Sequence, residues 1–147
     1  MSGTSMDAID VVLARIEADN TPTVAASASV DWPRDLRERL QATARGRRLD
    51  ATEFARLDTE LGTLFADAVL HMLQASEFSA AQVSAIGCHG QTIRHGPDAT
   101  FPYTAQIGDA NRIAARTSIW VVTSSAVVGS SKMIRSGRQA IAIAIGI

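Results

Sequence analysis

A run of polar side chains between residues 87 and 95 has the composition of a small-molecule binding site. The segment is Gly87-Cys88-His89-Gly90-Gln91-Thr92-Ile93-Arg94-His95, which contains two imidazoles, an amide, a hydroxyl and a guanidinium. This mixture suits a sugar with many hydroxyls and a carboxylate, because an arginine can bind a carboxylate or phosphate through two parallel hydrogen bonds. The alternative is a loop that only solvates its polar groups.

Residues 3–7 have the composition of a phosphate-binding turn. The segment Gly3-Thr4-Ser5-Met6-Asp7 combines a glycine, two hydroxyls and an acid. Small residues let backbone N–H groups approach phosphate oxygens, and the acid can hold a hydrated magnesium ion. The same residue types also favour ordinary turns, and no Gly-Lys-Ser/Thr follows that would make a Walker motif. Nucleotide binding and a plain turn both stay open on these residues alone.

A third polar segment joins a predicted strand to a predicted helix. It is Gln106-Ile107-Gly108-Asp109-Ala110-Asn111-Arg112-Ile113, in which Asp109 follows a glycine turn. An aspartate directly before a helix is in the position of an N-cap. At the rim of a sheet, the same carboxylate can instead hold a ligand hydroxyl. Capping and ligand binding both stay open.

A thiol nucleophile is the weakest functional hypothesis. Cys88 and His89 are adjacent, and neighbouring residues on a strand point to opposite faces, so they cannot form an ion pair. We expect Cys88, the one cysteine of the chain, to be a small core residue, and His71 to be a solvated or capped helical side chain. No set of His, Cys, Asp and Glu residues has the spacing of a metal site.

The first half of the chain carries the pattern of a hairpin and two helices. Two strand-like runs, 8–17 and 24–30, flank the turn Asp19-Asn20-Thr21-Pro22 and predict a β-hairpin. The spacing of Leu36 and Leu40 predicts a short helix from Arg34 to about Ala44, ended by Gly46. A long amphipathic helix begins near Asp50, which forms a capping-box pair with Glu53. Its predicted core stripe is Phe54, Leu57, Leu61, Leu64, Phe65, Ala68, Met72 and Leu73.

The second half alternates strands and helices. We predict strands over 83–88, 101–107 and 119–122, and a helix from Asp109 to about Arg116. The order ββααββαβ predicts an α/β domain with a mixed sheet and flanking helices. We expect the three polar segments to converge at one rim of a single sheet, where open α/β sheets bind ligands.

Composition limits the class of protein. The chain has 147 residues, 46% of them hydrophobic, which suits one domain of about 100 to 150 residues. Fourteen basic and fifteen acidic residues leave a net charge of -1, which favours a small-molecule partner over nucleic acid or a membrane. A single cysteine excludes an internal disulfide, and no secretory signal or apolar tract of about 20 residues is present. We expect a cytoplasmic protein.

In this order and spacing, the polar segments resemble the anhydro-N-acetylmuramic acid kinase family of the sugar kinase, Hsp70 and actin superfamily. The resembling stretches are residues 1–10, 86–95 and 106–114, with Leu57-Asp58, Leu61-Gly62 and Phe65-Ala66 in the long helix. The resemblance spans roughly residues 1–122. It implies the N-terminal lobe of an actin-like, sugar-kinase ATPase fold in truncated form.

The resemblance also implies an activity. It is phosphorylation of 1,6-anhydro-N-acetylmuramic acid by ATP with Mg²⁺, in which water opens the anhydro bridge, to give N-acetylmuramic acid 6-phosphate and ADP in peptidoglycan recycling. The full-length family is expected to include homodimers. The residues implied to hold the ATP phosphates are Gly3, Thr4, Ser5, Met6, Asp7, Ala8, Ile9 and Asp10. Those implied to line the sugar cleft are His89, Gln91, Thr92, Arg94 and Asp109.

The chain departs from the family pattern in ways that bear on activity. Ala8, Ala110 and Ser118 stand where the family usually has Gly, Pro and Gly. The family strand before the Gly3 turn has no counterpart, nor has the second lobe with the catalytic aspartate in an Asp-Thr-Gly-Pro-Gly segment. We therefore expect the chain by itself to be inactive. The alternative is a non-catalytic remnant or interaction module.

Residues 123–147 do not follow the family pattern. The family continues with an Asp-Phe-Arg stretch and a Gly-Gly-Gln-Gly segment, whereas residues 124–147 contain no acid and end in alternating alanine and isoleucine. We expect a disordered tail or the product of a shifted reading frame. The final alternation is also compatible with an edge strand, or with a segment that aggregates when exposed.

Overall fold

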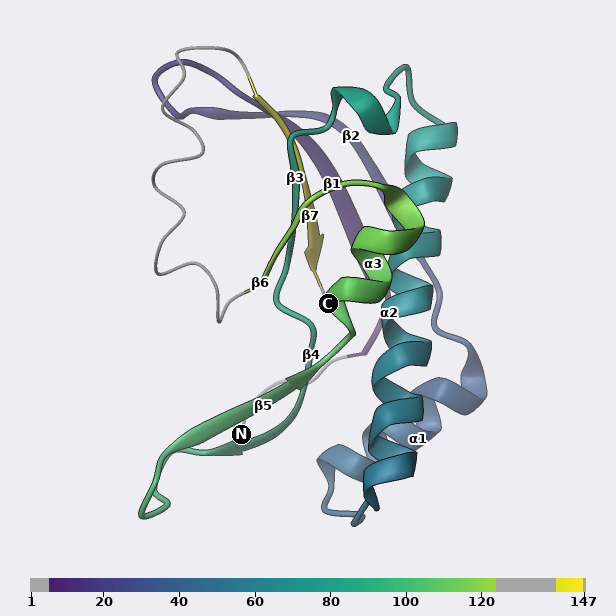
Figure 1. Cartoon of the computed structure of the whole chain (residues 1–147), viewed down its shortest axis with the longest axis vertical. Coiled ribbons are helices and arrows are strands. Elements are labelled where there is room, and N and C mark those ends of the chain that lie inside the picture. Colours follow the sequence, from purple (N-terminus) through teal and green to yellow (C-terminus); the bar gives the residue numbers. More distant parts are fainter. Residues whose placement is uncertain (1–5, 124–139, 147) are drawn as a thin grey trace.

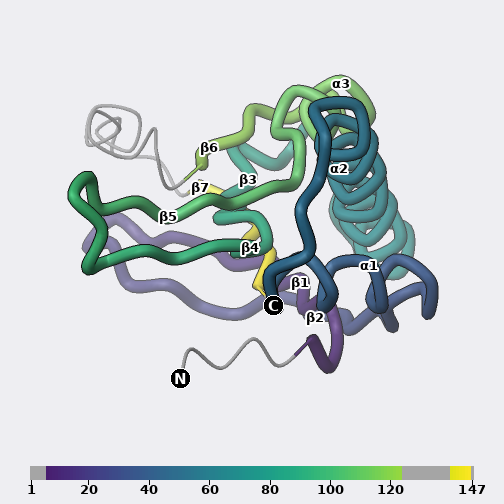
Figure 2. The backbone as a smooth tube through the Cα atoms, turned by 90° about the horizontal axis from the view of Figure 1, so that it is seen from below, coloured from purple at the N-terminus to yellow at the C-terminus, as the bar shows by residue number. Residues whose placement is uncertain are grey.

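The computed structural model describes residues 6–123 and 140–146. Figure 1 shows a twisted sheet with helices on one side and a two-stranded arm that leaves the body. Figure 2, seen from below, shows the same separation of helices and sheet. The mixed α/β fold class predicted from the sequence is confirmed for these residues.

The strands and helices have the following bounds. The main sheet consists of β1 (Ile9–Ile16), β2 (Pro22–Val30), β3 (Ala85–Cys88), β6 (Val121–Thr123) and β7 (Ala140–Gly146). The arm consists of β4 (Gln91–Gly96) and β5 (Tyr103–Ile107). The helices are α1 (Arg34–Ala44), α2 (Ala51–Gln74) and α3 (Ala110–Thr117), and η1 (Ala80–Gln82) is a single 3₁₀ turn.

The predicted β-hairpin is confirmed. β1 and β2 pair antiparallel, with a register shift between Leu13 and Ala14. In the connecting turn, the Thr21 N–H donates to the Asp19 carboxylate at 2.9 Å, and Asn20 adopts a φ of 65°. An asparagine tolerates this left-handed conformation better than most residues. The turn therefore sets the register in which β1 and β2 pair.

β7 is an interior strand, and not the edge strand that was one of the possibilities compatible with its sequence. The order of the main sheet is β2-β1-β7-β3-β6, and β7 runs antiparallel to β1 and parallel to β3. The alternation of isoleucine and alanine suits this place, because successive side chains of a strand face opposite sides. Ile143 and Ile145 are buried beneath the helices, whereas Ala144 is exposed on the other face. Residues 124–139 lie outside the described residues.

The helices follow the predicted patterns closely. α2 begins with the predicted capping box: the Glu53 N–H donates to Asp50 at 2.8 Å, and the Asp50 N–H donates to the Glu53 carboxylate. Phe54 is the exception, since its side chain is 42% exposed and the buried stripe starts at Leu57.

In the described parts of the chain, no helix is long and apolar enough to cross a membrane.

The arm corrects two expectations about the polar segments. The stretch from His89 to His95 is not a loop, because β4 begins at Gln91 and pairs antiparallel with β5. β5 in turn does not belong to the main sheet, so the described turns do not all come from one sheet. Exposed strands carry polar side chains on the solvated faces, as Arg94 and His95 do here, and this composition imitates a loop.

α2 packs closely against the turn between β5 and α3. A Cβ added at Gly62 of α2 would lie 2.7 Å from the Asp109 carbonyl oxygen and 2.9 Å from the Asp109 nitrogen. Real Cβ atoms do not approach backbone atoms so closely, so an alanine there would push the turn away from the helix. The glycine therefore sets the distance between α2 and this turn.

We predict that Gly62→Ala destabilises the protein by about 1–3 kcal/mol through overpacking. In a helix without this contact, the same substitution would stabilise by up to about 1 kcal/mol. Urea unfolding followed by circular dichroism measures the sign of the change. The control is Gly87→Ala, whose Cβ would meet only the Ile143 carbonyl oxygen at 3.8 Å. A stabilising Gly62→Ala would contradict the close packing.

Candidate functional site

Four strand ends lie together at one end of the main sheet. Cys88, near the end of β3, is paired with Ile145 of β7 and with Thr123 of β6, and these three strands run parallel. β1 runs the other way, and its Asp10 is paired with Gly146. The carboxyl ends of three parallel strands and the start of β1 thus meet at one rim. Ligands of open α/β sheets bind at such an edge.

A depression of about 240 Å³ lies at this rim. Its lining comes from the ends of β3, β5 and β6, the turn after β3, the turn between β5 and α3, the first residue of α3 and one residue of α2. The lining residues are Asp58, Cys88, His89, Gly90, Gln106, Ile107, Gly108, Asp109, Ala110 and Thr123. Of the residues predicted to bind sugar, His89 and Asp109 therefore lie together.

Two glycines allow the turns around the depression to approach each other. Gly90 has a φ of 69° and Gly108 a φ of 126°, conformations that favour glycine. A Cβ at Gly90 would lie 2.5 Å from the Ile107 carbonyl oxygen, and one at Gly108 would lie 2.6 Å from the Phe65 ring. The two turns are therefore packed against each other and against α2 without space for a side chain.

Asp58 holds the second turn in place. The Gly108 N–H donates to the Asp58 carboxylate at 2.7 Å, and the Asp109 N–H donates to the Asp58 carbonyl at 3.2 Å. Sequence reasoning gave Asp58 no role at the site. No local signal marks it, because Asp58 is half-buried next to the polar residues Thr59 and Glu60, and the group that it binds lies fifty residues away on Gly108.

Asp109 caps α3, which confirms one of its two predicted roles. Its carboxylate accepts from the N–H groups of Asn111 at 2.9 Å and Arg112 at 3.3 Å. These are two of the unpaired donors at the start of the helix. Asp109 also lines the depression, so the cap fixes the position of a carboxylate at the rim.

The remaining predicted sugar-binding residues lie on β4, outside the lining of the depression. Gln91 is only 4% exposed; its side-chain amide N–H donates to the Thr92 carbonyl at 3.0 Å, and its side-chain oxygen Oε1 has no hydrogen-bond partner among the described residues. The Thr92 hydroxyl accepts from Gln106 at 3.4 Å. The guanidinium of Arg94 lies beside Gly46, after the end of α1. Only the first residues of the polar run therefore reach the depression.

The described part of the predicted phosphate-binding segment is residues 6–10. Met6 and Ile9 are buried, whereas Asp7 and Asp10 are exposed near the rim. Asp7 forms an ion pair with Arg37 of α1 at 3.9 Å. Gly3, Thr4 and Ser5 lie outside the described residues.

Cys88 of β3 is buried and His71 of α2 is exposed, as predicted. Cys88 is 5% exposed, and burial raises the pKa of its thiol above the usual value. A buried, protonated thiol is a poor nucleophile. His71 is exposed. Among residues 6–123 and 140–146, no group of three or more His, Cys, Asp and Glu side chains is placed to hold a metal ion.

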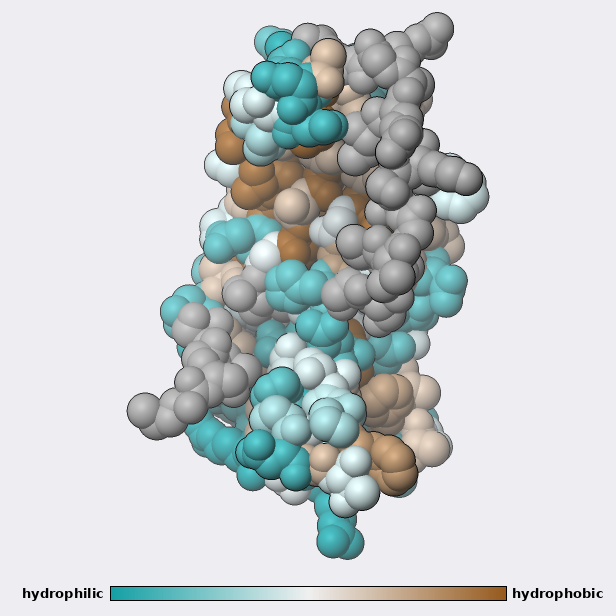
Figure 3. All heavy atoms as spheres, turned by 90° about the vertical axis from the view of Figure 1, so that its left-hand side faces the viewer, coloured by the Kyte–Doolittle hydropathy of each residue, from teal (hydrophilic) through white to brown (hydrophobic). Residues whose placement is uncertain are grey.

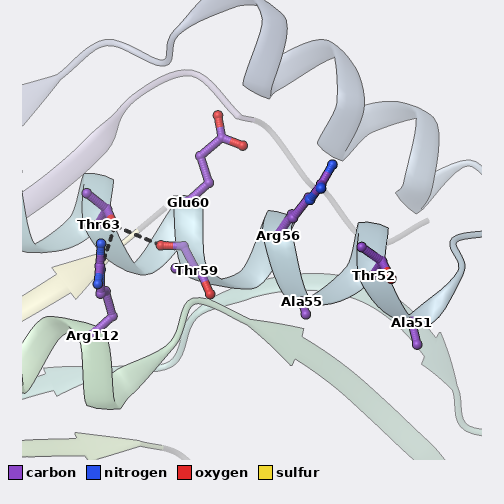
Figure 4. Close-up of a pocket in the computed structure, with 8 residues that line it drawn as sticks. All are labelled: Ala51, Thr52, Ala55, Arg56, Thr59, Glu60, Thr63 and Arg112. Atoms are coloured by element: carbon purple, nitrogen blue, oxygen red, sulfur yellow. Dashed lines mark hydrogen bonds between the residues drawn. The ribbon is translucent and has the colours of Figure 1, made fainter.

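A second depression, larger at about 690 Å³ but more open, lies along α2 beside Arg112 of α3 (Figure 4). Here the Arg112 Nε donates to the Thr63 hydroxyl at 3.1 Å, which in turn donates to the Thr59 carbonyl at 2.9 Å. Glu60 pairs with Arg39 at 2.6 Å. These polar groups already bond to one another along the helix surface, and two turns do not converge here as they do at the rim.

The described residues form a mixed α/β domain in which the carboxyl ends of three parallel strands lie at one rim, with a depression beside them. A sequence model described as anhydro-N-acetylmuramic acid kinase matches residues 1–127. The chain belongs to the anhydro-N-acetylmuramic acid kinase family. The match continues five residues beyond the boundary of 122 expected from the sequence and ends before β7.

Two departures from the family pattern lie at helix ends. Ala110 is the first residue of α3, a position at which proline is favoured because its missing N–H costs nothing there. Ser118 follows α3 with a φ of 58°, a left-handed conformation that glycine adopts without strain. The residues usual in the family would therefore suit both positions of this backbone.

We predict that Asp58→Ala destabilises the chain by about 1–3 kcal/mol, because the Gly108 N–H loses its acceptor. The matched control is Asp67→Ala on the same helix, which removes an exposed ion pair with Arg116 and should cost at most about 1 kcal/mol. Urea unfolding measures both. Equal effects of the two substitutions would contradict the role of Asp58 in holding the turn.

Proposed function

We propose that this chain forms one part of an active site, namely the part that the N-terminal lobe contributes. At this site, ATP phosphorylates 1,6-anhydro-N-acetylmuramic acid. Family membership supports the kinase class. The observation that carries the proposal is the rim, where the start of β1 and the depression that contains His89 and Asp109 lie at the same end of the sheet, with β7 between β1 and β3. A phosphate donor and a sugar must lie side by side for phosphoryl transfer, since positioning supplies much of the rate.

The sugar is proposed to bind in the depression. An imidazole, a carboxylate, an amide side chain and backbone groups of two turns surround it, which suits a ligand with several hydroxyls. The volume of about 240 Å³ is small, and a second lobe would have to complete the cavity. Gln91, Thr92 and Arg94 remain proposed sugar contacts, which would require the arm to approach the bound sugar.

ATP and Mg²⁺ are proposed to bind at the start of β1. Asp7 and Asp10 are exposed acids near the rim, and such acids can hold a hydrated magnesium ion beside phosphates. The small residues Gly3, Thr4, Ser5 and Ala8 would let backbone N–H groups approach phosphate oxygens. Arg37 adds a positive charge next to Asp7. When bound, Mg²⁺ would neutralise charge on the transferred phosphoryl group.

The proposed reaction needs groups beyond those at the rim. Water adds to C1 of the sugar, the bond from C1 to the bridging oxygen breaks, and that oxygen, on C6, takes the γ-phosphoryl group while ADP leaves. A general base must accept a proton from the water. The sequence of this chain contains no Asp-Thr-Gly-Pro-Gly segment, in which the resemblance places the catalytic aspartate. We therefore propose that the chain alone binds its ligands and turns over negligibly.

A non-catalytic module is the second candidate, favoured by the same missing segment. The two candidates differ in ligand binding. We predict that 1,6-anhydro-N-acetylmuramic acid shifts the backbone amide NMR signals of His89, Gly90, Gly108 and Asp109, and that a magnesium complex of a non-hydrolysable ATP analogue shifts those of Asp7 and Asp10. A module without the site would show neither set of shifts.

The control variants separate binding from folding. His89→Ala should weaken sugar binding by about fivefold, the equivalent of one hydrogen bond, without lowering the melting temperature. His71→Ala, which changes an exposed histidine of α2, should leave binding unchanged. Sugar-dependent ADP release by the unmodified chain would overturn the proposed lack of turnover.

A further inference from the structure

The middle strand of the main sheet comes from a part of the chain outside the family match. The match ends at residue 127, and β7 begins at Ala140. β7 is paired with β1 on one side and with β3 on the other. Within the described strands, it is the only link between the β2-β1 pair and the β3-β6 pair. The matched residues therefore depend on the tail for a continuous sheet.

The side chains of β7 fit this slot in one register. Ile143 lies opposite Leu13 on β1 and Ile86 on β3, and all three are buried at 1% exposure or less. Ala144, one residue further, faces the side without helices. Figure 3 shows the side of the molecule away from the helices, where apolar residues form one patch above the middle and another at the lower right. A slip by one residue would exchange the two faces, so the isoleucines select the register.

The end of β7 lies next to the start of β1. Gly146 is paired with Asp10, and the two strands are antiparallel, which is the geometry of a β-hairpin whose connection is absent. On its other edge, β7 pairs Ile145 with Cys88, the last residue of β3 before the depression. Thus β7 determines the distance between the start of β1 and the rim made by β3 and β6.

We propose that Ala140–Gly146, although it follows β6 in the sequence, fills the place between β1 and β3 and thereby positions the start of β1 at the rim. The occupant of the slot between β1 and β3 is the tail of the same chain. Residues 124–139 provide sixteen residues for the return from β6 to β7, and a connection between parallel strands needs about a dozen or more. The consequence for nucleotide binding rests on the proposed function, whereas the role in the sheet does not.

Cysteine pairs in the full chain test the register and the origin of the strand. Val12 is paired with Ala144, so Val12→Cys with Ala144→Cys should form a disulfide within one chain. The control, Val12→Cys with Ala140→Cys, moves the second cysteine four residues along β7, about 13 Å away, and should stay reduced. A dimeric product on a non-reducing gel would overturn the assignment to the same chain, and equal cross-linking of both pairs would overturn the register.

Two truncations on β7 test the positioning role. Ile145 lies at the rim, and Ile141 lies toward the opposite end of the strand. We expect Ile145→Ala to weaken binding of the magnesium and ATP-analogue complex at least fivefold, and Ile141→Ala to leave it within twofold, both measured well below the melting temperature. Equal effects of the two truncations on binding would overturn the positioning role. If the unmodified chain bound no nucleotide, the proposed function would fail, while the cross-linking result would still decide the role of β7 in the sheet.

Discussion

The fold depends on the hydrogen bonds that β7 makes along both of its edges. β1 with β2, and β3 with β6, are each only a pair of strands, and a pair of strands alone is at best marginally stable in water. With β7 between them, they become one five-stranded sheet with a continuous apolar face for α2 and α3. Ile143 and Ile145 contribute to the centre of this face. Without the pairing of β7 with both β1 and β3, α2 and α3 would have no continuous apolar face to pack against.

The same sheet defines where a ligand can bind. Three parallel strands end at one edge, and the close contacts of Gly62, Gly90 and Gly108 bring two turns and α2 together there. Asp58 satisfies the backbone of the nearer turn, and Asp109 caps α3. The site is thus made of backbone turns held by short contacts, and few of its features depend on long, mobile side chains. Such rigidity suits a site that has to position two reactants.

Local patterns predicted the local structure well. The turn at Asn20, the helix that contains Leu36 and Leu40, and the capping box of Asp50 and Glu53 depend on neighbours in sequence, and the structure has all of them. The place of β7 was not predictable in this way, because its partners lie more than a hundred residues away on β1 and 57 residues away on β3. β4 was mistaken for a loop because a solvated arm carries polar side chains on its strands.

The candidate site was predicted only in part, because local patterns indicate strand ends and do not indicate contacts between distant residues. His89 and Asp109 follow strand ends, and a place directly after a strand is enough to indicate the rim. Thr92 and Arg94 are close to His89 in sequence but lie on the arm, because β4 leaves the main sheet after Gly90. Asp58 reaches the site from the middle of α2 through a contact with Gly108 fifty residues away, and no local pattern encodes such a contact.

Hydrogen–deuterium exchange of the full chain tests the central claim most directly, since an amide bonded inside a sheet exchanges only when the sheet opens. If β7 holds the sheet together, the amides of residues 141–145 exchange as slowly as those of Val11 and Leu13 in β1. Exchange of residues 141–145 as fast as that of the exposed tip of the arm, around Thr100, would contradict it.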